Sequence, residues 1–288
     1  MGVKMLEINT RRKFVKDFGL TVPVLEDPYF DYIIKQINAE EKLQLLLDEI
    51  SLHGTEQNFF GHIKQITEKI VADIDVSSLE QDSLSKYKVD KPNEQTNVYN
   101  KNNNGRNVIS IDLVKANYQA LKEFNPSLVQ NSKNYEEFIK IYTDSVYMAK
   151  SRHIRQYMFG NLAPKRQTHI WKWIMYQTSM MLRDYEIFAV SSDEIVIYDE
   201  TNISNIEKIL SYFPWDFKIR KFVLEQIHDY DYYRRIFPDG TYDFKQVPIQ
   251  YIMQFIKHYK NEEINEMDLT FTHESGRLAR FIEPLCFN

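Results

Sequence analysis

The sequence contains one cysteine, Cys286, and few of the residues that make a chain flexible. One cysteine cannot form an internal disulfide or supply a zinc cluster built on several thiolates. Because Cys286 lies two residues from the last residue, we do not expect it to act as a catalytic thiolate. Glycine occurs 8 times and proline 9 times in 288 residues, so few flexible linkers are predicted.

Long apolar runs are also absent. No stretch of about 18 consecutive apolar residues occurs, so the sequence predicts no membrane-spanning helix. The segment MGVKMLEINTRRKFVKDFG carries charges throughout and lacks the apolar core of a secretory signal. Leu6 stands where an N-myristoylation signal requires Ser or Thr. We therefore expect a cytoplasmic protein that has no membrane partner.

A strong positive charge is missing as well. The formal net charge is −5, whereas domains that coat DNA are usually basic. This charge leaves open an enzyme that grips nucleic acid along one local patch. Each basic cluster alone is typical of a solvated surface. The clusters are Arg11–Arg12–Lys13, Lys150–Arg152–Arg155–Lys165–Arg166, Lys218–Arg220–Lys221 and Arg234–Arg235.

Apolar and aromatic residues are plentiful. Hydrophobic residues make up 43% of the chain, which is typical of globular proteins, and there are 19 tyrosines and 18 phenylalanines. Aromatic side chains build cores, and they can also stack on nucleic-acid bases. The length suits one large domain or two small ones with a sizeable core.

The first 86 residues are predicted to be largely helical. Asp27–Pro28 is a typical helix start, and apolar residues recur at helical spacing from Phe30 to Ile50, where His53–Gly54 ends the run. A second helical pattern extends from Phe60 to Ile74. The polar stretch 87–106 then indicates a loop or hairpin, and a boundary between domains.

Residues 87–288 mix strands with helices. Strands are predicted for VISIDL at 108–113, for EIFAV and IVIY on either side of Ser191–Glu194, and for several segments after residue 217. Helices are predicted at 116–121, 135–149, from Pro164, at 203–212 and at 248–260, and a final hairpin surrounds Ser275–Gly276. Without a regular alternation of strand and helix, this order indicates the α+β class.

Three segments carry residues suited to phosphoryl transfer. A buried strand ends at Asp112 where a helix begins, a basic helical segment with Lys150, Arg152 and Arg155 leads to Phe159–Gly160, and a hairpin tip carries Asp193–Glu194. Two Mg²⁺ ions about 4 Å apart can activate a 3′-hydroxyl and steady a leaving pyrophosphate. Such ions prefer oxygen ligands, and an incoming triphosphate requires cationic side chains on one helical face.

These segments, in this order, resemble motifs A, B and C of family A DNA polymerases. That family carries Lys, three residues and then Phe-Gly, and this chain has Arg155 followed by Phe159–Gly160; the His-Asp-Glu of its third motif corresponds to Ser192–Asp193–Glu194. The resemblance implies a palm-like antiparallel sheet packed with helices over residues 87–288. It also implies that Asp112 and Asp193 are ligands of Mg²⁺ or Mn²⁺.

The resemblance extends to the remaining site residues, with departures. It implies that Glu194 is an accessory catalytic carboxylate and that Arg155, with Arg152 and Lys150, binds the triphosphate. Arg155 replaces a lysine, and arginine is a poorer proton donor to pyrophosphate. Tyr118 stands six positions after Asp112, where many polymerases place the sugar-contacting residue five after. We predict that Tyr118 and Phe159 also contact substrate.

The sequence therefore predicts a template-dependent nucleotidyltransferase. Its partners would be nucleic acid and nucleoside triphosphates, and a protein partner would complete the polymerase fold, because the resemblance covers only residues 107–200. Two alternatives stay open. One is a metal-dependent nuclease that uses the same carboxylates. The other is a non-catalytic binding protein on a decayed polymerase scaffold, which the gap of 33 positions from Gly160 to Asp193 favours. The composition is typical of a virus or mobile element with an AT-rich genome.

Overall fold

The structure is a computed structural model that describes residues 6–18, 29–89, 98–191, 193–198, 203–227, 231–272 and 277–286. Its contacts divide the chain into two compact units. Unit 1 comprises residues 1–73, 136–158 and 247–288, and unit 2 comprises 74–135 and 159–246. The division predicted from the sequence instead keeps 87–288 together. No described helix combines the length and the apolar character that crossing a membrane requires.

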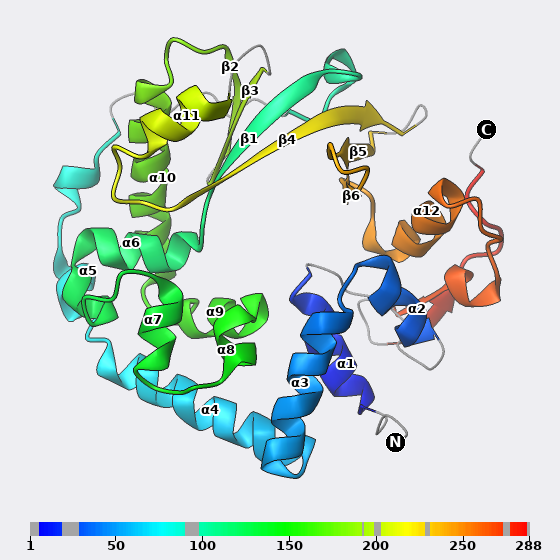
Figure 1. The fold of residues 1–288 in the computed structure, drawn as a ribbon, viewed down its shortest axis with the longest axis horizontal. Coiled ribbons are helices and arrows are strands. Elements are labelled where there is room, and N and C mark those ends of the chain that lie inside the picture. Colours follow the sequence, from blue (N-terminus) through cyan, green and yellow to red (C-terminus); the bar gives the residue numbers. More distant parts are fainter. Residues whose placement is uncertain are drawn as a thin grey trace. The chain divides into compact units, whose positions relative to one another are not determined.

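Unit 2 is built on a six-stranded sheet in the order β2-β3-β1-β4-β5-β6, and every neighbouring pair is antiparallel. Figure 1 shows the long strands β1 and β4 side by side. This sheet, packed with helices, confirms the predicted α+β class. The strands are β1 (Asn107–Leu113), β2 (Ile187–Val190), β3 (Glu194–Tyr198), β4 (Phe217–Gln226), β5 (Tyr233–Ile236) and β6 (Tyr242–Lys245).

The helices of unit 2 give the sheet its connectivity. Helices α6 (Ala116–Phe124) and α10 (Pro164–Met181) contact each other, α10 also contacts β3, and α11 (Ile203–Leu210) connects β3 to β4. Within unit 2 the order is β1, α6, α10, β2, β3, α11, β4, and most of α7–α9 (residues 135–159), between α6 and α10, belongs to unit 1. With strand order 2-3-1-4, this is the ferredoxin-like, or split βαβ, arrangement with one extra helix. The hairpin β5–β6 extends this sheet at the edge formed by β4.

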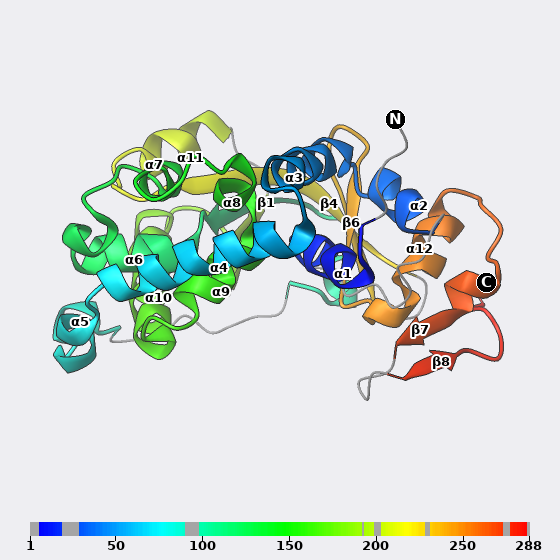
Figure 2. The same ribbon diagram turned by 90° about the horizontal axis from the view of Figure 1, so that it is seen from below.

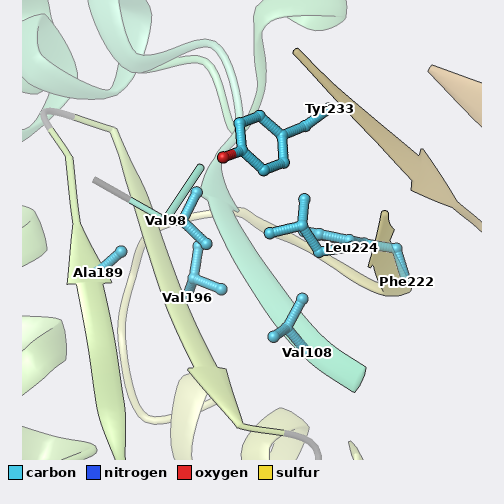
Figure 3. Packing of buried hydrophobic residues seen from close by; sticks show 7 residues of the cluster. All are labelled: Val98, Val108, Ala189, Val196, Phe222, Leu224 and Tyr233. Atoms are coloured by element: carbon cyan, nitrogen blue, oxygen red, sulfur yellow. The ribbon is translucent and has the colours of Figure 1, made fainter. Parts of the chain in front are cut away.

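Alternation along the strands separates the two faces of the sheet. Ile109 and Ile111 on β1, and Ile195 and Ile197 on β3, are fully buried on one face. The opposite face carries an apolar cluster whose side chains converge across the central strands, as Figure 3 shows. Its members are Val98, Val108, Ala189, Val196, Phe222, Leu224 and Tyr233. Beyond this cluster, the same face carries charged side chains.

Unit 1 is mostly helical and closes with a short hairpin. Helix α3 contacts α2, α4 and α8. Strand β7 pairs with β8, and Figure 2 shows the two strands side by side. The elements are α1 (Ile8–Lys16), α2 (Tyr29–Gln36), α3 (Glu40–His53), α4 (Glu56–Asp73), α7 (Tyr135–Lys140), α8 (Val146–Lys150), α9 (Arg152–Phe159), α12 (Ile252–Tyr259), β7 (Thr270–Thr272) and β8 (Leu278–Arg280). Of these, the first residue of α7 and the last residue of α9 belong to unit 2.

A buried carboxylate joins α1 to the α8–α9 segment inside unit 1. Asp17 has no exposed side-chain surface, and it accepts hydrogen bonds from the Ser151 hydroxyl at 2.8 Å and the His153 backbone N–H at 2.7 Å. The ammonium of Lys42 lies 3.2 Å from its second oxygen, and the Tyr147 hydroxyl donates to the same oxygen. A paired and hydrogen-bonded charge is how a protein tolerates a buried carboxylate.

Several predicted helices are interrupted in the structure. The run from Phe30 to Ile50 is split into α2 and α3 by Asn38, whose φ of 51° breaks the helical backbone. The run ends as predicted at Gly54, which has φ of 79°. The stretch 135–149 forms two short helices, and the helix predicted at 248–260 begins with a 3₁₀ turn. Asp27–Pro28 and Ser275–Gly276 lie outside the described residues.

The remaining elements are short. They are α5 (Ser77–Gln81), η1 (Ser85–Tyr87), η2 (Lys101–Asn103), η3 (Pro126–Val129), η4 (Ile249–Tyr251) and η5 (Glu266–Leu269). Asn265 caps the last of these in a capping box, because its side chain accepts from the Asp268 N–H while the Asp268 carboxylate accepts from the Asn265 N–H.

Candidate functional site

The pairing of β1 with β3 brings the backbones of the two predicted acidic segments together. Asp112 and Glu194 are direct partners across the two strands, and the Leu113 N–H donates to the Asp193 carbonyl at 2.9 Å. Cα atoms of such partners lie about 4.5–5.5 Å apart in antiparallel sheets. Two acidic segments that are distant in the sequence therefore meet at one end of the central strand pair.

Local sequence explains this convergence. In VISIDL the side chains alternate, so Ser110 and Asp112 share one face of β1 while Ile109 and Ile111 occupy the other. The tip between β2 and β3 is closed by the Ser191 N–H, which donates to the Glu194 carbonyl at 2.8 Å. Asp193 is exposed at this tip.

Ser110 and Arg220 hold the two carboxylates on the sheet face. The fully buried Ser110 hydroxyl donates to Glu194 Oε1 at 2.6 Å and lies 3.5 Å from Asp112 Oδ2. Arg220, on β4 opposite Ser110, donates from its guanidinium to the same Asp112 oxygen at 2.7 Å. About three tenths of each side chain in the Asp112–Arg220 pair is exposed, at 29% and 28%.

Arg235 extends this group of charges to the edge of the sheet. Its side chain is only 4% exposed, and it makes a two-pronged pair with Asp243, at 2.7 and 2.5 Å. A third contact, at 3.3 Å, connects its guanidinium to Glu194. The Lys245 ammonium lies 3.9 Å from Asp243. The sheet face thus carries a connected set of acidic and basic groups across β3, β1, β4, β5 and β6.

We call this set the charged network. It contains three carboxylates and three basic groups, so its formal charges sum to zero: Asp112, Glu194 and Asp243 against Arg220, Arg235 and Lys245. Burial, and then the neighbouring Asp112 carboxylate, raise the pKa of Glu194. Burial, and then the nearby Arg235, lower the pKa of Lys245. Both shifts favour the neutral forms of side chains that are removed from water.

Aromatic rings border the charged network. The Arg220 guanidinium lies 5.5 Å from the centre of the Phe237 ring, and that of Arg235 lies 5.2 Å from the Phe222 ring. Phe237 also packs edge-on against Phe222. These rings keep water from one side of both arginines, which strengthens the ion pairs.

The donor atoms here suit a hard divalent cation, but the carboxylates have other partners. Carboxylate and hydroxyl oxygens from Asp112, Glu194 and Ser110 are the ligand type that Mg²⁺ prefers. Within the part of the chain that the structure describes, however, no three acidic, His or Cys side chains gather closely enough to hold a metal ion. Asp112 and Glu194 instead pair with Arg220 and Arg235. Cation binding therefore requires these pairs to loosen.

Tyr118 and Phe159, which were predicted to contact substrate, are buried in the core and not part of the charged network. Tyr118 is 1% exposed, and its hydroxyl donates a buried hydrogen bond to the Ser132 carbonyl. Phe159 is fully buried. Both rings pack on Tyr135, with centroids 6.0 Å apart in each case. Core packing is thus the role that the structure gives Tyr118 and Phe159, since neither presents a ring face to the surface.

The predicted triphosphate-binding residues belong to the other compact unit. Lys150, Arg152 and Arg155 are in unit 1, whereas Asp112, Asp193 and Glu194 are in unit 2. The Lys150 side chain is 52% exposed, at 4.0 Å from Glu41, and Arg152 is exposed on α9. A joint role of these basic residues with the carboxylates stays a prediction.

Sequence reasoning missed the basic half of the charged network. From the sequence alone, Arg220 and Arg235 are expected in solvated surface clusters, and neither Ser110 nor Lys245 is predicted as a site residue. The available signal was alternation: in FKIRKFVLEQ, Lys218, Arg220, Phe222 and Leu224 share one face of β4. Residues two positions apart in a strand lie on the same face of the sheet. A charged residue two or four positions from a buried apolar residue is therefore expected on the face that carries the core.

Comparison with known proteins gives no family for this chain. No protein-family model matches it, and no curated protein matches its sequence.

Proposed function

We propose that the chain is a template-dependent nucleotidyltransferase that uses two divalent metal ions, Mg²⁺ or Mn²⁺. The observation that carries this proposal is the meeting of Asp112 with Asp193–Glu194 at neighbouring ends of β1 and β3. Carboxylates on rigid strand ends suit a reaction that depends on positioning and on stabilising charge.

Each acidic residue has a distinct role in the proposal. Asp112 and Asp193 would hold the ions, which when bound polarise the attacking 3′-hydroxyl and neutralise the departing pyrophosphate. Glu194 would act as an accessory carboxylate that Ser110 orients through its 2.6 Å hydrogen bond. Ser110 has no exposed surface, so this orientation is fixed from inside the sheet.

The partners follow from the reaction. Nucleoside triphosphate and nucleic acid would be the substrates, with Lys150, Arg152 and Arg155 as phosphate contacts. A protein partner would supply the parts of a polymerase that the sequence resemblance does not cover. A cytoplasmic location, in a cell that carries a virus or mobile element, would suit such an enzyme.

A second candidate function is favoured by the ion pairs. Arg220 at 2.7 Å from Asp112, and Arg235 at 3.3 Å from Glu194, satisfy both carboxylates without a cation. A non-catalytic nucleic-acid-binding or protein-binding protein on a polymerase-like scaffold would have this arrangement. A nuclease remains the other enzymatic alternative, because hydrolysis uses the same carboxylates and ions.

A primer–template assay with a labelled primer separates the three functions. With Mg²⁺ or Mn²⁺ and nucleoside triphosphates, a nucleotidyltransferase lengthens the primer, a nuclease shortens it, and a binding protein leaves it unchanged. We expect lengthening that falls at least about 100-fold in Asp112→Asn and Asp193→Asn, because each loses a charge that the ions require. Asp184→Asn, at an exposed position outside the sheet, is the matched control.

A further inference from the structure

Arg220 faces two surroundings at once. One guanidinium nitrogen donates to Asp112 Oδ2 at 2.7 Å, the oxygen that lies on the Ser110 side of the charged network. The same side chain lines an open pocket of about 490 Å³ between β4 and the turn that joins β5 to β6. Arg220 therefore connects the carboxylates to a space that a ligand can enter.

The hydrogen bonding of Arg220 is incomplete. A guanidinium carries five N–H donors in a planar fork. The Nε of Arg220 is buried, and it has no hydrogen-bond partner among the residues that the structure describes. An unpaired buried donor costs free energy, on the order of 1–3 kcal/mol. The side chain thus has unused capacity for an acceptor with several oxygens.

The pocket beside Arg220 suits an anion. Two of its lining residues, Arg220 and Lys221, are cationic, and Arg220 is the one whose side chain shares the sheet face of the charged network. The single acidic lining residue, Asp239, already accepts hydrogen bonds from the backbone N–H and the hydroxyl of Thr241. Planar arginine donors match phosphate oxygens in pairs, so a phosphate group is the ligand class that this lining fits best.

We propose that Arg220 exchanges partners: it pairs with Asp112 in the ligand-free protein, and it binds a phosphate group in this pocket when Asp112 takes a divalent cation. The inference rests on the metal-binding role of Asp112 in the proposed function. Its consequence is thermodynamic. Cation and phosphate bind cooperatively, because each stabilises the arrangement in which Arg220 has left Asp112.

The charge balance of the charged network also leads us to expect that a cation and a phosphate group bind cooperatively. Its six groups sum to zero and Asp193 adds one negative charge, so a divalent cation that binds alone still leaves a net positive charge beside partly buried arginines. A phosphate group that arrives with the cation offsets this charge where the dielectric is low. A divalent ion alone is therefore expected to bind weakly.

Mn²⁺ titration, followed by electron paramagnetic resonance with and without inorganic phosphate, tests the exchange. For the wild type we expect phosphate to tighten Mn²⁺ binding at least about fivefold. For Arg220→Gln we expect tighter Mn²⁺ binding without phosphate, because the competing guanidinium is gone, and no further gain when phosphate is added. The control is Arg234→Gln, which removes an arginine of β5 that pairs with Glu225 at 2.6 Å. This control should behave like the wild type.

Either of two outcomes overturns the exchange: Arg220→Gln leaves the Mn²⁺ affinity unchanged or weaker, or its phosphate effect persists. A measurement on the wild type covers the case in which the variant does not fold. The Arg220 Nε–H signal in the NMR spectrum should shift when diamagnetic Mg²⁺ and phosphate are added together, and a signal that stays in place contradicts the proposal.

The primer–template assay keeps the two proposals separable. If Mn²⁺ and phosphate bind cooperatively but the protein does not extend primers, the partner exchange of Arg220 holds and the nucleotidyltransferase function is wrong. If the protein extends primers but binds Mn²⁺ and phosphate independently, the nucleotidyltransferase function holds and the partner exchange is wrong.

Discussion

At the scale of single residues, Ser110 shows how a small side chain can organise larger ones. Ser110 has no exposed surface, and its hydroxyl donates a hydrogen bond of 2.6 Å to Glu194. A hydrogen bond to a carboxylate that is shielded from water is stronger than one between neutral groups at the surface. The position of Glu194 thus depends on a serine that lies inside the sheet.

Ser110→Ala is predicted to destabilise the protein. The substitution removes the hydrogen-bond donor and leaves a mostly buried carboxylate oxygen with one partner fewer, so the free energy of unfolding should fall by about 1–3 kcal/mol. Urea denaturation measures this loss, and Ser78→Ala, on the exposed side of α5, is the control. A loss below about 0.5 kcal/mol, as in surface substitutions, would show that Glu194 does not depend on Ser110.

The acidic residues of the site could be found from sequence because their signals are local. Asp112 ends a strand with an evident apolar pattern, and Asp193–Glu194 forms the tip of a short hairpin. Arg220 and Arg235 were missed because their partners come from pairings distant in the sequence. Nothing near Arg220 in the chain indicates that β4 lies beside β1, and Arg235 reaches Glu194 across two intervening strands.

At the scale of elements, the start of α9 depends on a contact with α1. The His153 N–H at the first turn of α9 donates to Asp17, which follows α1. Burial, then the positive charge of Lys16 and that of Lys13, lower the pKa of His153, while Asp17 opposes the shift. The folded protein therefore favours the neutral imidazole.

His153 should make stability fall in mild acid. Because the pKa of His153 is lower in the folded protein than its usual value of about 6.5, the unfolded chain binds more protons below that pH. The stability is fully present above about pH 6.5 and decreases as the pH falls below it. His153→Gln should therefore lose less stability between pH 7.5 and 5.5 than the wild type does.

Urea denaturation at several pH values measures this difference, with His169→Gln as a control for removal of an exposed histidine. Equal pH dependence of the wild type and His153→Gln would contradict the assignment. A steeper dependence in the variant would mean that the folded protein favours the charged imidazole.

Helix boundaries were predicted well where a glycine or proline marks them. They were predicted poorly where a residue other than glycine ends the helix by adopting a positive φ. Gly54 ends α3, and Pro164 opens α10, as their residue types indicate. Asn38 interrupts an apolar pattern that continues through it, because its φ of 51° is a property of the fold. Asparagine tolerates this conformation better than most residues, but its presence does not require it.

At the scale of the molecule, the class and the sheet were predictable, and the assignment of segments to units was not. Mixed strand and helix patterns indicated α+β, which the antiparallel sheet confirms. The C-terminal segment 247–288 belongs to the same unit as the N-terminal helices, partly through the Tyr29 hydroxyl, which donates to Asp268. Contacts between such distant segments depend on side chains that meet only in the folded chain.

Crystals soaked with Mn²⁺ and a non-hydrolysable nucleoside triphosphate would show directly whether Asp112 and Asp193 hold divalent ions. Anomalous scattering locates Mn²⁺ without assuming its ligands. We expect a peak within coordination distance, about 2.0–2.4 Å, of carboxylate oxygens from both Asp112 and Asp193, with Arg220 turned toward phosphate oxygens. Manganese that binds only elsewhere, or carboxylates still paired with Arg220 and Arg235 at saturating nucleotide, would contradict this expectation.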